Sequence, residues 1–208
     1  MNHAVVVGVD GSAQSAAAAA CAAEEARRSG RVLRMVHVVE GEGGALAPAG
    51  QPEERLPEGV TGIRDRTAAV LPELETTCRR MTGRPAYVLA AAGEREGLLV
   101  LGSWGLGGVA GLLVGSVGLR TAAHARCPVV LVRDGADDAV SGRGEVVVGV
   151  RGERPCDAVL AFAFDQAARR GTVLRAVEAR TSDSGPYVTR APLDQQAIRA
   201  RRAAWSAS

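Results

Sequence analysis

The sequence contains no lysine, and this absence excludes two kinds of chemistry. All 25 basic residues are arginine. A Walker-A phosphate loop and a Schiff-base mechanism both require a lysine, so this sequence supports neither. Any site in it must therefore use carboxylate, hydroxyl, imidazole, thiol, guanidinium or main-chain groups.

Aromatic residues, cysteine patterns and long apolar runs are also scarce. Aromatics make up 3% of the chain and hydrophobic residues 47%, which favours a globular α/β protein over disorder. Cys21, Cys78, Cys127 and Cys156 are widely spaced, so neither a disulfide framework nor a zinc site is indicated. Without a membrane-length apolar run or a signal-peptide pattern, we expect a cytoplasmic protein. The net charge of +2 predicts no strong attraction to nucleic acid or to a membrane surface.

Strand and helix patterns alternate along the first two thirds of the chain. Valine-rich apolar runs predict strands that are buried on both faces. Helix signals lie between them, such as Ser12 before and Gly30 after an alanine-rich segment. The predicted strands are 4–12, 31–40, 73–81, 97–102 and 128–133, and the predicted helices are 12–30, 59–71, 84–96 and 116–126. This order predicts an α/β fold with a doubly wound, open, parallel five-stranded sheet.

The chain then repeats its own beginning. After a polar linker at 134–144, the segment from Val146 aligns without a gap on the segment from Val5, and about half of the positions are identical. The second copy has a strand, a helix and a second strand, and residues 187–208 fit one further helix. It has no counterpart of the last strand. We therefore predict a complete domain at 1–133 and a truncated second domain at 145–208.

Residues 102–116 hold six glycines in fifteen positions, between a predicted strand and a predicted helix. Open α/β sheets bind ligands where loops leave the carboxyl ends of parallel strands. Glycine lets main-chain N–H groups face an anion, and Ser116 begins the next helix, where free N–H groups can reach a phosphate. A flexible connection is the alternative. The flanking elements, and Asp10 at the end of the first strand, favour a phosphate-binding loop.

The motif Gly102-x2-Gly105-x9-Gly115-Ser116 resembles that of the ATP-binding branch of the universal stress protein family. The sequences VVVGVDGS near the N-terminus and HVVE at the end of the second strand add to the resemblance. It covers residues 4–133 as one domain and residues 145 to about 204 as a truncated copy. It implies a Rossmann-like sheet of the adenine nucleotide alpha hydrolase type.

The resemblance also implies a nucleotide site. Asp10 corresponds to an acidic residue that contacts the nucleoside, and Val38 to a residue that lines the adenine pocket. Trp104 stands where the family more often has His or Arg, which removes one polar phosphate contact. The implied site residues are Gly8, Val9, Asp10, Val38, Leu101, Gly102, Gly105, Gly115, Ser116 and Val117. The implied ligand is ATP accompanied by magnesium, and no metal-ligating residue stands out.

We interpret the chain as a nucleotide-responsive regulator of a stress response rather than an enzyme, because the loop supplies anion donors but no evident general base. Two alternatives remain. One is a slow ATPase or nucleotide-transferring enzyme that uses the same loop. The other is an interaction protein that binds no nucleotide.

The second copy and the last strand carry two further expectations. Arg151 occupies the position of Asp10, and Glu153 that of Ser12. Because arginine cannot accept a hydrogen bond from ribose, we predict that the second copy binds no ATP. In the family the last strand commonly pairs across a dimer, so strand 128–133 is expected to form a homodimer edge. A regulatory protein partner is also expected, but its identity cannot be read from the residues.

The remaining reactive residues are interpreted as structural. Ser116 nearly fits a nucleophile elbow, but Val114 replaces the required glycine, and His124 is too far along the helix to act as a base. His37 fits a core histidine, and Cys127 is at most a weak redox candidate.

Overall fold

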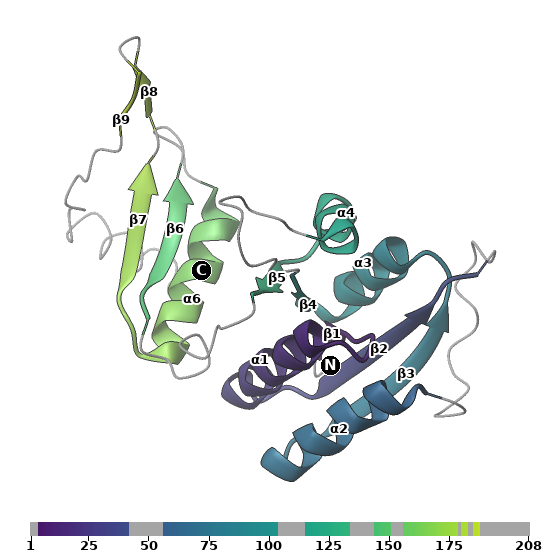
Figure 1. The fold of residues 1–208 in the computed structure, drawn as a ribbon. Helices are drawn as coiled ribbons and strands as arrows, with labels where there is room; N and C mark the ends of the chain where they lie inside the picture. The colour runs from purple at the N-terminus through teal and green to yellow at the C-terminus, as the bar shows by residue number, and fades with distance from the viewer. Residues whose placement is uncertain are drawn as a thin grey trace. The chain divides into compact units, whose positions relative to one another are not determined.

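The structure is a computed structural model that divides the chain into two compact units. It describes residues 4–41, 56–103, 115–133, 144–150 and 156–178, together with the backbone of 180–182 and 185–187. Unit 1 is Met1–Ser141 and unit 2 is Gly142–Ser208. Figure 1 shows the helices and strands of both units.

Unit 1 is built on one parallel sheet. Its strands are β1 (Val5–Gly8), β2 (Leu33–Val39), β3 (Thr76–Thr82), β4 (Leu99–Gly102) and β5 (Val129–Val132). They pair in the order β3-β2-β1-β4-β5. The helices are α1 (Ala13–Ser29), α2 (Glu58–Val70), α3 (Pro85–Glu96) and α4 (Ser116–His124). The prediction of an open, parallel five-stranded α/β sheet is confirmed.

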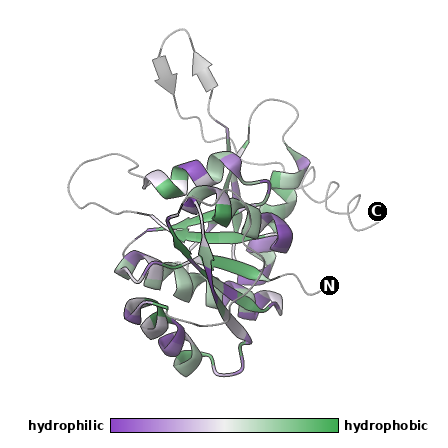
Figure 2. Ribbon diagram, turned by 90° about the vertical axis from the view of Figure 1, so that its right-hand side faces the viewer, coloured by the Kyte–Doolittle hydropathy of each residue, from purple (hydrophilic) through white to green (hydrophobic). Residues whose placement is uncertain are grey.

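The core lies on both faces of this sheet, because β1 is central and apolar throughout. On one face Val6 and Val36 pack with Leu89 of α3 and with Leu99 and Leu101 of β4. The other face is covered by α1, whose buried residues are mostly alanines and therefore allow a close approach. Figure 2 shows the hydrophobic strands between helices that carry hydrophilic residues on their outer sides.

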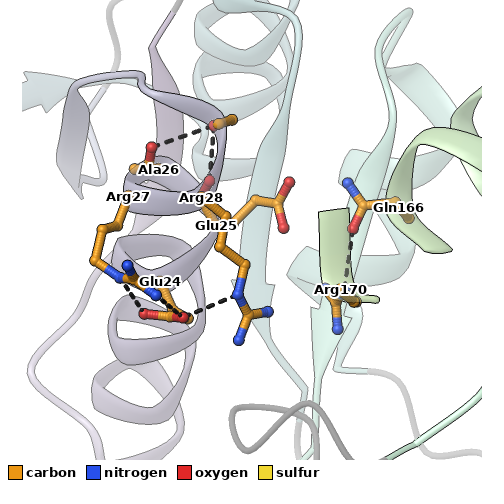
Figure 3. A network of polar contacts seen from close by, with 8 residues as sticks. Glu24, Glu25, Ala26, Arg27, Arg28, Gln166 and Arg170 are labelled. Atoms are coloured by element: carbon orange, nitrogen blue, oxygen red, sulfur yellow. Dashed lines mark hydrogen bonds and ion pairs between the residues drawn. The ribbon is translucent and has the colours of Figure 1, made fainter. Parts of the chain in front are cut away.

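Helix α1 begins and ends at residues that the sequence marks. The Ser12 hydroxyl accepts a hydrogen bond from the Ser15 N–H at 3.1 Å, and Gly30 ends the helix with φ of 63°. In the last turns, Glu24 forms ion pairs with Arg27 at 2.7 Å and with Arg28 at 2.9 Å (Figure 3). Cations near a helix C-terminus also interact favourably with the helix dipole.

Unit 2 repeats the β-α-β order. Strands β6 (Val146–Val150) and β7 (Leu174–Glu178) pair in parallel, and α6 (Asp157–Arg170) connects them. A short antiparallel pair follows, β8 (Arg180–Ser182) with β9 (Gly185–Tyr187). The helix predicted for 187–208 does not begin at Tyr187, because this residue pairs with Arg180 in β9 and tyrosine favours strands. Residues 188–208 lie outside the described part of the chain.

A helix that crosses a membrane needs about 20 consecutive, mostly apolar residues. Within the described ranges, no helix is both long enough and apolar enough to cross a bilayer.

Candidate functional site

The strand order of unit 1 places a topological switch point beside β1. From β1 the chain proceeds to β2 and β3 on one side, and then to β4 and β5 on the other. In open α/β sheets, ligands bind outside the carboxyl ends of the strands at the point where the order reverses. Asp10 follows β1, and Gly102 is the last residue of β4. The two predicted residues therefore flank the switch point.

Asp10 is held in one orientation by the turn that leads into α1. Its Oδ1 accepts a hydrogen bond from the Ser12 N–H at 2.9 Å, and its own N–H donates to the Ser15 hydroxyl at 3.3 Å. Partial burial alone would raise the pKa of Asp10, but hydrogen bonds from Ser12 and Ser15 outweigh it and lower this pKa below its ordinary value. The exposed side chain is therefore an ionised hydrogen-bond acceptor at neutral pH.

Gly102 has a packing role that its glycine identity alone does not reveal. A Cβ at this position would lie 2.6 Å from the carbonyl oxygen of Gln14. The end of β4 therefore touches the main chain in the first turn of α1. Next to it, buried Ser103 donates from its N–H and its hydroxyl to the Val132 carbonyl, at 2.7 and 3.0 Å. These contacts fix the direction in which the chain leaves β4.

Helix α4 begins on the same edge of the sheet. Because β5 is parallel to β4, the connection between them must return to the amino end of the sheet, and α4 makes that return. Gly115 is the N-cap residue and offers no side-chain hydrogen bond to the helix. The first N–H groups of a helix have no intrahelical partner. The exposed residues Ser116 and Val117 lie in this first turn.

The other predicted site residues lie at or near the carboxyl ends of β1, β2 and β4. A Cβ at Gly8 would lie 2.7 Å from Leu101 Cδ2, so these two residues pack on each other beneath the edge. Val9 is buried, and its carbonyl accepts a hydrogen bond from His37 Nδ1 at 2.9 Å. Val38 is half-buried against the core cluster of β1, β2, α3 and β4. His37 is thus bound to the main chain, as expected of a core histidine.

Comparison with known proteins assigns the fold and the family. The sequence model of the Universal stress protein family matches residues 1–133. The chain belongs to the universal stress protein family. Universal stress protein Rv2005c of Mycobacterium tuberculosis is 32% identical over 190 residues, covering 85% of this chain. The chain spans 64% of the length of that relative.

A solved structure shares this α/β fold. The crystal structure of a universal stress protein from Archaeoglobus fulgidus DSM 4304 aligns with a TM-score of 0.61 at 16% identity, over 100% of this chain and 75% of that chain. A universal stress protein crystallised in complex with cAMP aligns at 26% identity and a TM-score of 0.49, over 64% of this chain and 98% of that chain.

Several residues named from the family motif lie outside the described ranges. These are Trp104 and Gly105 in the glycine-rich segment, and Arg151 and Glu153 in the second copy. Their predicted roles stay predictions. Of the motif, the structure describes Gly102, Gly115 and Ser116.

Two features of this universal stress protein domain were missed in the sequence. One is Ser15, whose hydroxyl accepts from the Asp10 N–H and donates to the Ser12 carbonyl at 2.9 Å. The clustering of Asp, Gly and Ser after a strand is a signal for such turns. The other is a contact between Gly11 and Gly59, which no local pattern in the sequence indicates.

His124 and Cys127, two reactive residues of unit 1, have structural surroundings. His124 lies on the exposed side of α4, with Nδ1 bonded to the Arg120 carbonyl at 2.7 Å and its ring edge-on to Tyr87. Burial, and secondarily Glu94, raises the pKa of the Cys127 thiol, which keeps it in its less reactive neutral form. Among the described residues, no group of three His, Cys, Asp or Glu side chains could hold a metal ion.

Proposed function

We propose that unit 1 binds ATP at the carboxyl edge between β1 and β4. The Asp10 carboxylate accepts hydrogen bonds from the ribose hydroxyls, and the phosphates lie against the glycine-rich segment and the start of α4. The proposed binding residues are Gly8, Val9, Asp10, Val38, Leu101, Gly102, Gly105, Gly115, Ser116 and Val117. Magnesium arrives with the phosphate oxygens and needs no dedicated protein cluster.

One observation carries this proposal: an oriented carboxylate and the end of β4 flank the switch point of the sheet. Ser12 and Ser15 hold Asp10 ionised at the end of β1. The Gly102–Gln14 contact brings the end of β4 to the first turn of α1. The exposed first turn of α4 adds main-chain N–H groups, which suit a phosphate.

We propose that this site senses a nucleotide rather than turning it over, and that the chain acts as a regulator in a stress response. The groups assigned to the phosphates are main-chain N–H groups and one hydroxyl, which stabilise charge but do not supply a general base. A slow ATPase would need a general base at the phosphates, whereas the one carboxylate among the assigned residues, Asp10, is placed at the ribose. Phosphate release above the buffer rate, lost in Gly115→Val, would instead support an enzyme.

We further propose that unit 2 is a partial second copy that binds no ATP, and that β5 pairs with β5 of a second chain. In the sheet of unit 1, β5 is a terminal strand with one neighbour, β4. An apolar edge strand of this kind favours association with another strand. Sedimentation at micromolar concentration is expected to give a dimer, and a monomer would count against the pairing.

Isothermal titration of the whole chain with MgATP tests the nucleotide proposal. Asp10→Ala removes the ribose acceptor and is expected to lower the affinity at least about tenfold, the effect of losing one charge-assisted hydrogen bond. Asp65→Ala is the matched control, because Asp65 is an exposed aspartate on α2 that pairs only locally, with Arg64. If the wild-type protein binds no ATP, the proposal is wrong and the alternative of an interaction protein without a nucleotide is favoured.

A further inference from the structure

The loop that carries Asp10 is in main-chain contact with the first turn of α2. A Cβ built on Gly59 would lie 3.1 Å from Gly11 Cα and 3.2 Å from the Gly11 carbonyl oxygen. The contact is reciprocal, since a Cβ on Gly11 would lie 3.3 Å from Gly59 Cα. Gly11 also has φ of 90°, which side-chain-bearing residues rarely adopt. The backbone of Gly11 thus favours glycine, and a side chain at Gly59 would displace the Gly11 main chain.

Gly11 lies between the two residues whose hydrogen bond orients the proposed ribose acceptor. Asp10 precedes it, and Ser12, whose N–H donates to Asp10 Oδ1, follows it. A displacement of the Gly11 main chain therefore moves the donor relative to the carboxylate. The chain on both sides is anchored, by β1 before the turn and by α1 after it. The first turn of α2 is the element that meets the turn from outside.

We propose that Gly59 is a positioning residue for the nucleotide site. Because it has no side chain, α2 packs directly on the main chain of Gly11, and this contact sets the orientation of Asp10. This inference rests on the proposed function, since it assigns Asp10 to the nucleoside. It predicts that nucleotide affinity depends on a residue of α2 that supplies no group to the ligand.

The chain contains a matched control on the same helix. Gly62 is also an α2 glycine, but a Cβ there meets only the end of the Arg66 side chain, at 3.7 Å. Gly62 lies inside α2, where alanine raises helix propensity by about 0.5 to 1 kcal/mol, and Gly59 lies in the first turn of the same helix. Both valine substitutions add the same side chain to α2, and only the one at Gly59 meets the main chain of Gly11. The two alanine variants are milder forms of the same comparison.

The experiment measures MgATP affinity by calorimetry and the Asp10 titration by carbon-detected NMR, on the whole chain. Gly59→Val is expected to weaken ATP binding about tenfold or more and to move the Asp10 pKa up toward its ordinary value. Gly62→Val is expected to change neither. If Gly59→Val does not fold, Gly59→Ala repeats the test, because its Cβ requires a shift of only a few tenths of an ångström.

Each outcome decides the inference. Unchanged affinity and unchanged Asp10 titration in the Gly59 variants would overturn it. Weaker binding without a change in the Asp10 titration would also overturn it, because the effect would not pass through Asp10. Wild-type protein that binds no ATP would refute the proposed function, while the Asp10 titration would still show whether Gly59 positions the turn.

Discussion

Units 1 and 2 share half of a β-α-β sequence, yet the shared residues have different environments. Val6 and Val36 are 0% and 1% exposed in unit 1, under α3 and beside β4. Val147 and Val177 occupy the same places in the repeat and are 54% and 36% exposed. This sheet face is therefore buried by α3 and β4, which follow the β-α-β unit, and not by the β-α-β unit itself.

The charges on that face differ in the same way. In unit 1, Arg34 of β2 pairs with Glu96 at the end of α3, and Glu96 also accepts from the Ala4 N–H at 2.8 Å. In unit 2, Arg175 stands where Arg34 stands and pairs with Glu145, at the position of Ala4, at 2.7 Å. In unit 2 the partner of this arginine therefore comes from the residue before β6, whereas in unit 1 it comes from α3.

The largest expected contrast comes from placing a carboxylate at the equivalent valines. Val6→Asp buries an unpaired charge and is expected to cost unit 1 about 4 kcal/mol or more of unfolding free energy. Val147→Asp places the same group on an exposed face and should cost roughly 0.5 kcal/mol or less. Urea denaturation of the whole chain followed by circular dichroism measures both. Equal effects would contradict the difference in burial.

The two helix C-termini should respond alike. Gly30 and Gly171 have φ of 63° and 62°, and nothing lies within 4 Å of a Cβ built on either. Alanine at either position therefore incurs only the left-handed backbone penalty, about 1 to 2 kcal/mol. Thermal melts of Gly30→Ala and Gly171→Ala are expected to show losses that agree within about 0.5 kcal/mol. Clearly different losses would show that the two helix ends do not have equivalent surroundings.

The helix N-termini should differ, by a smaller amount. Ser12→Ala removes the cap of α1 and is expected to cost about 1 kcal/mol. Cys156→Ala should cost less than about 0.5 kcal/mol, because Cys156 makes no side-chain cap to α6. Thermal melts of both variants and of the wild type give the two losses in stability. A larger loss for Cys156→Ala than for Ser12→Ala would reverse the expected order.

The loss in Ser12→Ala should also depend on pH. The Ser12 hydroxyl and the Ser12 main-chain N–H both lower the pKa of folded Asp10, and alanine removes only the hydroxyl. The stabilisation from the hydroxyl is present above the ordinary aspartate pKa, about 4. It is lost as the pH falls through the lower folded value. The gap between wild type and Ser12→Ala is therefore expected to narrow below about pH 4. A gap that widens with acid would show that Ser12 does not act on Asp10.

The sequence was sufficient for the features that depend on neighbouring residues. Apolar runs placed β1, β2, β4 and β5, whereas β3 has no such run and was expected only as a further strand of the same sheet. Asp10 was placed at the end of β1 because the apolar run stops there. The Gly11–Gly59 contact was not predictable, since it joins main chain from two distant segments and leaves no residue pattern. Gly102 was assigned to phosphate, and nothing in the sequence indicated that it also packs on Gln14.

Native mass spectrometry of the whole chain with ATP tests the central claim most directly, because it counts ligands per chain. We expect one ATP per chain, with the same occupancy in Asp65→Ala and a clearly lower occupancy in Asp10→Ala at an ATP concentration near the wild-type Kd. Two ATP molecules per chain would show that unit 2 also binds. No bound ATP, or equal occupancy in wild type and Asp10→Ala, would contradict the proposed site.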